Sequence, residues 1–189
     1  MMDIANAIVT LLVGSVAILV YGLSKRAERR NAATIIIMDI RHAEQVVMSV
    51  LEKDRIDRSM RRIIMENNWV KYKHLFASTF SSDDFSAFNR FFYACVEIAE
   101  SRERMMSVFE ENVRAKSQFI QNEILSIEDP SSSEGQQKRH DIIKQVEAEI
   151  YVFEPNEPKL RIRHNLQMMG RLSTTVAFDK LRKIAGRNA

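Results

Sequence analysis

The sequence predicts an all-α protein: an N-terminal transmembrane helix continuing into a cytoplasmic helical bundle that contains a long coiled-coil-like helix. Three observations lead to this prediction. Residues 4–23 carry no charged side chain, and only 5 Gly and 3 Pro interrupt the 189 residues. Apolar residues also recur at spacings of three and four over long stretches. We expect a transmembrane anchor at 1–24, a cytoplasmic bundle at 25–128, a loop at 129–136, and a C-terminal helical segment with a basic tail at 137–189.

The uncharged run at the N-terminus has the length of a membrane span. At about 1.5 Å per residue, residues 4–23 reach roughly 30 Å, the thickness of a bilayer's hydrocarbon core. A cleavable signal peptide would place positive charge before the apolar run, whereas here Asp3 precedes it and a basic cluster follows. A buried helix of a soluble protein is the other alternative, and a run closed by Lys and Arg fits it poorly.

The charges beside the span predict its orientation. Four basic residues and Glu28 follow it directly, and the basic ones are Lys25, Arg26, Arg29 and Arg30. Because positive residues stay on the cytoplasmic side, we expect the N-terminus outside the cell inner membrane and the remaining chain in the cytoplasm. A single cysteine, Cys95, agrees with a reducing compartment, since no disulfide can form within the chain.

One stripe of the predicted span carries small and polar residues. Its members recur at spacings of four, four, three and four: Asn6, Thr10, Gly14, Ala17 and Tyr21. Small residues let two helices approach closely, and Asn or Thr can hydrogen-bond across the contact. The stripe therefore predicts a homo-oligomer that forms through this face.

The helical pattern continues beyond the membrane. We expect the first helix to run on to about Lys53, followed by a more broken stretch at 54–82 in which Trp69 is a core residue. The sequence Ser81-Ser82-Asp83-Asp84 is typical of a helix start, and it opens a run to about Ile127. A seam follows this run, and its main members are Phe85, Phe88, Phe92, Phe109 and Val113. The helix that packs on the seam is either residues 25–53 of the same chain or a second copy.

The C-terminal part begins after the Ser- and Gly-containing loop at 129–136. A helix is expected from Gln137 to Phe153, but residues 150–163 also fit a β-hairpin with its turn at Glu154–Pro158. We favour a helix after this turn, closed by Gly170, because Ile162, Leu166 and Met169 share one helical face. Ser173 would then cap a last helix that ends near Ala185.

The tail is strongly basic. Residues 159–189 contain eight Lys or Arg and a single acidic residue, Asp179. Their net charge is +7, which leaves −4 for residues 1–158. We expect its side chains to contact an anionic lipid surface in preference to nucleic acid, because the chain is already tethered to the membrane. A helix docked on the protein's own acidic part is the alternative. The residues assigned to this contact are Lys159, Arg161, Arg163, Arg171, Lys180, Arg182 and Lys183.

No catalytic or cofactor pattern stands out. The five glycines form neither a dinucleotide fingerprint nor a phosphate loop. No Glu-x-x-His pair of a di-iron bundle occurs, and Asp39 with His42 is an isolated pair on one helical turn. Cys95 lies on the apolar seam, where a thiol is unreactive. We expect a protein that is not an enzyme and holds no metal or cofactor.

The layout of an N-terminal span, a basic cluster and the aromatic helix AFNRFFYACVEIAESRERMMSVFEENV resembles the small membrane-anchored helical proteins of bacteria and phages that are grouped as domains of unknown function. We expect a self-associating membrane adaptor that binds a cytoplasmic protein through its bundle. The resemblance implies one alternative, a membrane effector of phage defence or superinfection exclusion that assembles in the bilayer. The basic tail gives a second alternative, a membrane-tethered protein that binds nucleic acid.

Overall fold

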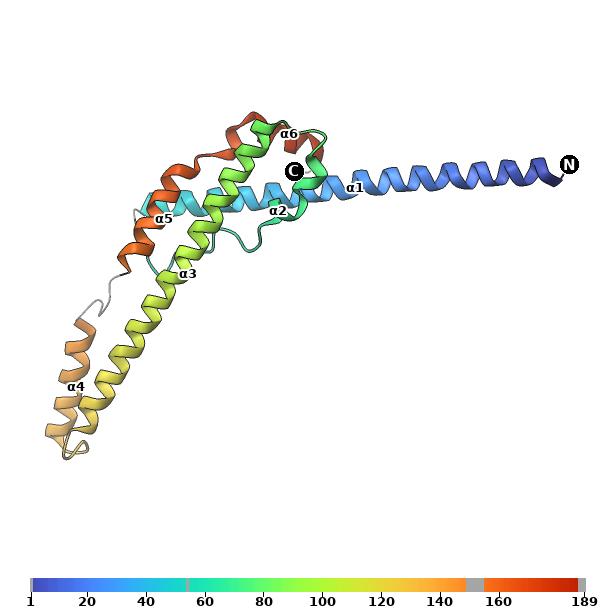
Figure 1. Ribbon diagram of the computed structural model, residues 1–189. Helices are drawn as coiled ribbons and strands as arrows, with labels where there is room; N and C mark the ends of the chain where they lie inside the picture. Colours follow the sequence, from blue (N-terminus) through green and yellow to red (C-terminus); the bar gives the residue numbers. More distant parts are fainter. Residues whose placement is uncertain (1, 54, 149–154, 187–189) are drawn as a thin grey trace.

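The computed structural model describes residues 2–53, 55–148 and 155–186, with side chains from residue 11 onward, and these segments contain helices and no strand (Figure 1). The all-α prediction is therefore confirmed. In chain order the elements are α1 (Met2–Lys53), α2 (Asn68–Tyr72), the 3-10 helix η1 (Lys73–Phe76), α3 (Ser82–Leu125), α4 (Ser133–Ala148), α5 (Asn156–Met169), the 3-10 helix η2 (Leu172–Thr174) and α6 (Val176–Ala185).

Helix α1 is continuous over 52 residues, as the pattern predicted. No Gly or Pro occurs between residues 23 and 53, so nothing breaks its hydrogen-bond ladder where it enters the body of the protein. Its second half packs into the core through one face, made of Ala32, Ala33, Ile36, Ile37, Ile40, Ala43, Val46 and Val50. Its first half extends away from the other helices (Figure 1).

The broken stretch after α1 is held by the core. Met60, Ile63 and Ile64 are buried, and the Arg102 guanidinium donates a hydrogen bond of 2.8 Å to the Met60 carbonyl. The Asn67 side chain then caps α2 by accepting from the backbone N–H of Val70. Residues 55–67 thus connect α1 to α2 without forming a helix, and buried side chains and hydrogen bonds hold them against the core.

Trp69 lies at the centre of an aromatic cluster. Its side chain is fully buried, and its ring stacks on Phe88 with centroids 4.6 Å apart. The indole N–H donates to the Asn89 side-chain oxygen at 2.7 Å, so the one polar atom of the ring is satisfied. The other rings around it are Phe76, Phe80, Phe85 and Phe92. The expected core position of Trp69 is confirmed.

Helix α3 starts where the sequence indicated. The Ser81 side chain accepts from the Asp84 backbone N–H, and the Asp84 carboxylate accepts from the Ser81 backbone N–H, which together form a capping box. Phe88, Phe92 and Phe109 are buried, and Phe85 is partly buried.

The predicted seam is wrong at its C-terminal end. Val113 is 50% exposed, and the neighbouring Asn112 is buried instead. Burial of Asn112 is tolerated because its amide donates to the Val108 carbonyl at 2.9 Å. The buried face of α3 therefore passes through Ile98 and Met105 on its way from Phe92 to Phe109.

The main partner of α3 is α5, which is neither of the two partners that we predicted. Residues Ile162, Leu166 and Met169 of α5 are buried, and the Met169 sulfur lies 3.9 Å from the Cys95 thiol on α3. Helix α4 folds back beside the distal half of α3, away from the body (Figure 1). Residues 149–154, which include the first strand of the alternative hairpin, lie outside the described residues, but its second strand is wrong because α5 is helical.

The last described helix packs on α1. Helix α6 packs along α1 with Ala177, Phe178, Leu181 and Ala185 buried. Thr175, and not Ser173, caps α6, because the Thr175 hydroxyl accepts from the Phe178 N–H while the Ser173 backbone N–H donates to the Glu44 carboxylate. Gly170 and Gly186 follow α5 and α6 with positive φ, as expected of helix-ending glycines.

Candidate functional site

Residues 11–23 of α1, which extend from the body, are apolar on all sides and uncovered. Between residues 11 and 23 its large apolar side chains are 57–75% exposed, the most exposed being Ile18 and Leu11. Among the residues described with side chains, no helix is both long enough and apolar enough to cross a membrane. The first residues of the predicted span, 4–10, lie outside those described with side chains.

The predicted pairing face is described in part. Asn6 and Thr10 lie outside the residues with described side chains, whereas Gly14, Ala17 and Tyr21 are exposed. A Cβ atom placed on Gly14 would meet nothing within 4 Å. No other described segment of this chain therefore covers the C-terminal part of this face.

The four basic residues after the apolar segment divide into two pairs. Lys25 forms an exposed ion pair of 2.8 Å with Glu28, and Arg26 is exposed. Arg29 donates to the Thr79 hydroxyl, and Arg30 Nε donates to the Ala185 carbonyl at 2.9 Å. Because Ala185 is the last residue of α6, the Arg30 guanidinium lies at the negative end of that helix dipole. Arg29 and Arg30 thus connect α1 to the body.

The basic residues of the C-terminal segment do not form one continuous surface. Arg161 donates to the Glu97 carboxylate of α3 at 2.9 Å, and Lys180 lies 2.6 Å from the Asp84 carboxylate. Lys159 is half-buried. The exposed members are Arg163, Arg171, Arg182 and Lys183. The sequence alternative of a helix docked on the protein's own acidic residues therefore describes part of this segment.

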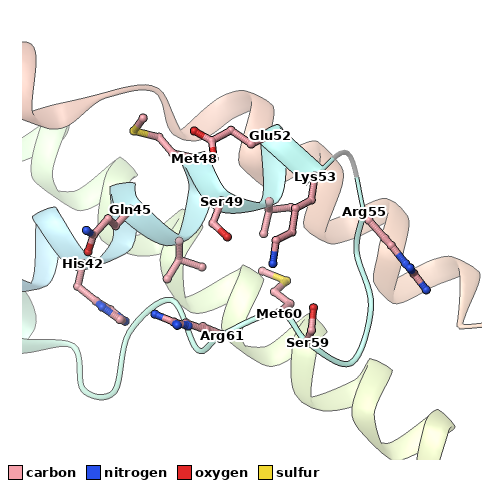
Figure 2. Close-up of a pocket in the computed structure, with 12 residues that line it drawn as sticks. His42, Gln45, Met48, Ser49, Glu52, Lys53, Arg55, Ser59, Met60 and Arg61 are labelled. Atoms are coloured by element: carbon pink, nitrogen blue, oxygen red, sulfur yellow. The ribbon is translucent and has the colours of Figure 1, made fainter.

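A cavity of about 390 Å3 lies between the last turns of α1 and the connection that follows it (Figure 2). Polar and basic residues line much of it, among them His42, Ser49, Lys53, Ser59 and Arg61. The His42 Nε2 atom donates to the Arg62 carbonyl at 3.0 Å, so the imidazole is engaged in holding the connection. Within the described residues, no group of three or more His, Cys, Asp or Glu is placed to hold a metal ion.

Cys95 and the pair Asp39 and His42 are structural in this fold. Burial raises the pKa of the Cys95 thiol, which disfavours the reactive thiolate. Burial also raises the pKa of Asp39, whose carboxylate accepts a hydrogen bond of 2.9 Å from the Asn68 side chain. That contact ties α2 to α1.

An open apolar groove of about 450 Å3 lies beside α2 and α3. It is lined by Trp69, Phe92 and Val96 together with the outward-facing Val70 and Tyr93, which are 55% and 66% exposed. Sequence periodicity did not indicate this surface, because Val70 and Tyr93 lie off the seam that the spacing selected.

No family model, curated protein or solved structure matches this chain. The function is therefore argued from the geometry above. The features that stand out are the uncovered apolar half of α1 and the basic residues where that half meets the body.

Proposed function

We propose that this chain is a non-enzymatic, single-pass membrane adaptor, in which the first half of α1 is the anchor and the helical body binds a cytoplasmic protein. The main support for this proposal is that the two halves of α1 have different surroundings. Residues 11–23 expose apolar side chains on every face, and the half that follows buries one face in the core. Burying so much exposed apolar surface in hydrocarbon is strongly favourable.

The hydropathy of residues 4–23 supports this proposal, because it extends the uncovered apolar segment to the length of a bilayer. The basic residues that follow it support a cytoplasmic body. The aromatic seam is used inside the chain, since Phe88, Phe92 and Phe109 are buried. A partner protein would therefore contact outward-facing residues of the bundle and not the seam.

Membrane insertion is tested by fractionation and by cysteine mapping. The chain should stay in the membrane pellet after alkaline carbonate extraction. In a Cys95→Ser background, a membrane-impermeant maleimide should label Met2→Cys in intact cells and Ser107→Cys only after lysis. Release by carbonate, or equal labelling of both cysteines in intact cells, would refute the anchor and its orientation.

Self-association is proposed through the face that contains Gly14. In the Cys95→Ser background, Thr10→Cys should give disulfide-linked dimers in the membrane, and Gly14→Leu should reduce their yield by separating the helices. Val16→Leu is the matched control, because Val16 lies off this face and exposes its side chain. Equal dimer yields from the Gly14 and Val16 variants would exclude this face as the contact.

A further inference from the structure

Separate segments of the chain meet α1 just where its uncovered apolar half ends. The last residue of α6 accepts a hydrogen bond from Arg30, and a Cβ on Gly186 would lie 3.5 Å from Arg30 Nε. Thr79, which follows η1, accepts from Arg29. Figure 1 shows α6 beside α1. The fold thus brings residues from the end of the chain to the base of the apolar segment.

Both segments that meet here carry exposed basic side chains, beside the exposed acidic residues Glu28 and Asp179. Lys25 and Arg26 lie on α1, and Arg182 and Lys183 lie on the last turn of α6. We call these four residues the basic collar. His74 of η1 is close enough to Glu28 to lower the pKa of that carboxyl, behind the larger effect of Lys25. Glu28 is engaged with Lys25 in an ion pair.

Two other exposed cations, Arg163 and Arg171, lie far from this level. Arg163 borders a cavity together with Val50, Leu51 and Arg55, at the other end of α1. Residues 30 and 51 of one helix are separated by roughly 30 Å at about 1.5 Å per residue. Arg171 adjoins η2, where the Ser173 N–H meets Glu44, about 20 Å along α1 from Arg30.

We infer that the basic collar binds the headgroups of anionic phospholipids and so holds the end of α6 against the bilayer. This inference rests on the proposed anchor, because an anchor that ends near Leu23 places residues 24–30 at headgroup level. Lys and Arg at that level are attracted to anionic lipid, and long side chains can reach the phosphates while their stems stay on the protein. Lipid contact therefore belongs to the collar, and Arg163 and Arg171 take no part in it.

Hydrogen exchange on the full chain in lipid nanodiscs tests the collar. Local unfolding of α6 would break its lipid contacts, so bound headgroups should slow amide exchange in 176–186. We expect exchange about tenfold slower in discs containing phosphatidylglycerol than in discs of phosphatidylcholine alone. The difference should be lost in the double variant Arg182→Gln, Lys183→Gln.

The matched control removes two charges from elsewhere on the same segment. Arg163→Gln with Arg171→Gln should keep the full lipid dependence of α6 exchange. Equal exchange of the unmodified chain in both disc types, or loss of the effect in the control variant alone, would overturn the inference. A short DNA duplex that protects α6 in phosphatidylcholine discs, where phosphatidylglycerol has no effect, would assign the collar to nucleic acid instead.

Failure of the collar and failure of the anchor give different results. If the collar is wrong, the chain still resists carbonate extraction and only the lipid dependence of exchange disappears. If the anchor is wrong, the unmodified chain is released by carbonate.

Discussion

The ammonium of Lys180 lies 2.6 Å from the carboxylate of Asp84, and so joins α6 to the first turn of α3. The same carboxylate accepts from the Ser81 backbone N–H and closes the α3 capping box. Burial would raise the pKa of Asp84, but the hydrogen bonds from Lys180 and Ser81 outweigh it and lower that pKa. One carboxylate thereby serves two helices.

Replacing Asp84 should weaken both contacts and change the acid stability. A carboxyl whose pKa is lower in the folded state stabilises it above its ordinary pKa near 3.9, and this stabilisation is lost as pH falls through the folded value. Asp84→Asn should lower the free energy of unfolding by about 1 kcal/mol at neutral pH. The variant should also lose part of its dependence on pH below about 5. Fluorescence of Trp69, the only tryptophan, measures unfolding of the full chain in detergent micelles.

Asp83→Asn is the control for this change. Asp83 is the adjacent residue in the same helical turn, and its side chain is exposed. It should change the free energy of unfolding by less than about 0.5 kcal/mol. Equal destabilisation by the two variants would mean that the helix dipole, and not the contact with Lys180 and Ser81, accounts for the effect.

Truncating Phe88 should be among the most destabilising changes in the bundle. Phe88 is fully buried and stacks on both Trp69 and Phe80. Phe88→Ala should cost about 3 to 5 kcal/mol, since it removes buried apolar surface and leaves a cavity. Phe119→Ala, at a half-exposed position on the same helix, should cost well under half as much. Denaturant titration of the two variants gives this comparison directly.

Gly135 permits the turn between α3 and α4. A Cβ at this position would collide with the Asp129 carbonyl oxygen, which belongs to the backbone and cannot rotate away. Gly135→Ala should therefore displace the start of α4 and speed amide exchange throughout Ser133–Ala148. Gly22→Ala is the control, because a Cβ there meets nothing within 4 Å. Unchanged exchange in α4 would show that the turn adjusts without loss of packing.

Cys95 should resist thiol reagents in the folded chain. Its side chain is fully buried, and burial raises the pKa of the thiol, so little thiolate is present or accessible at neutral pH. Labelling by Ellman's reagent should be slow until denaturant is added. Ser107→Cys, at an exposed position on the same helix, should react at once. Rapid reaction of Cys95 in the native chain would reveal frequent opening between α3 and α5.

Local sequence rules predicted the elements well. The start of α3 followed from Ser81 and Asp84, and the continuity of α1 followed from the lack of Gly and Pro after residue 22. These features depend on neighbours within one helical turn. The end of the seam was missed because apolar spacing takes no account of side-chain hydrogen bonds to the backbone. Spacing alone preferred Val113 to Asn112, and only the bond to the Val108 carbonyl makes burial of the amide tolerable.

The periodicity of the sequence could not predict which helices pack against each other. An amphipathic pattern indicates that a face is buried but not which helix buries it. The choice of α5 as the partner of α3 depends on contacts such as Glu97 with Arg161, which are 64 residues apart. The proposed collar lay beyond the sequence for the same reason, because the end of α6 meets Arg30 of α1 only after α6 has packed on α1. The sequence therefore indicated the basic residues, but not that Arg161 and Lys180 form ion pairs with Glu97 and Asp84 of α3.

The contact between Arg30 and Ala185 also has a consequence for biosynthesis. These residues are 155 positions apart, so α1 leaves the ribosome long before the helix that covers it. Until α6 has been made, Ile36, Ile40 and Ala43 lack part of their packing surface, and an apolar face of this kind is prone to aggregation. The fold therefore closes over α1 only after α6 has been synthesised, and until then protection of α1 comes from a chaperone or from the membrane itself.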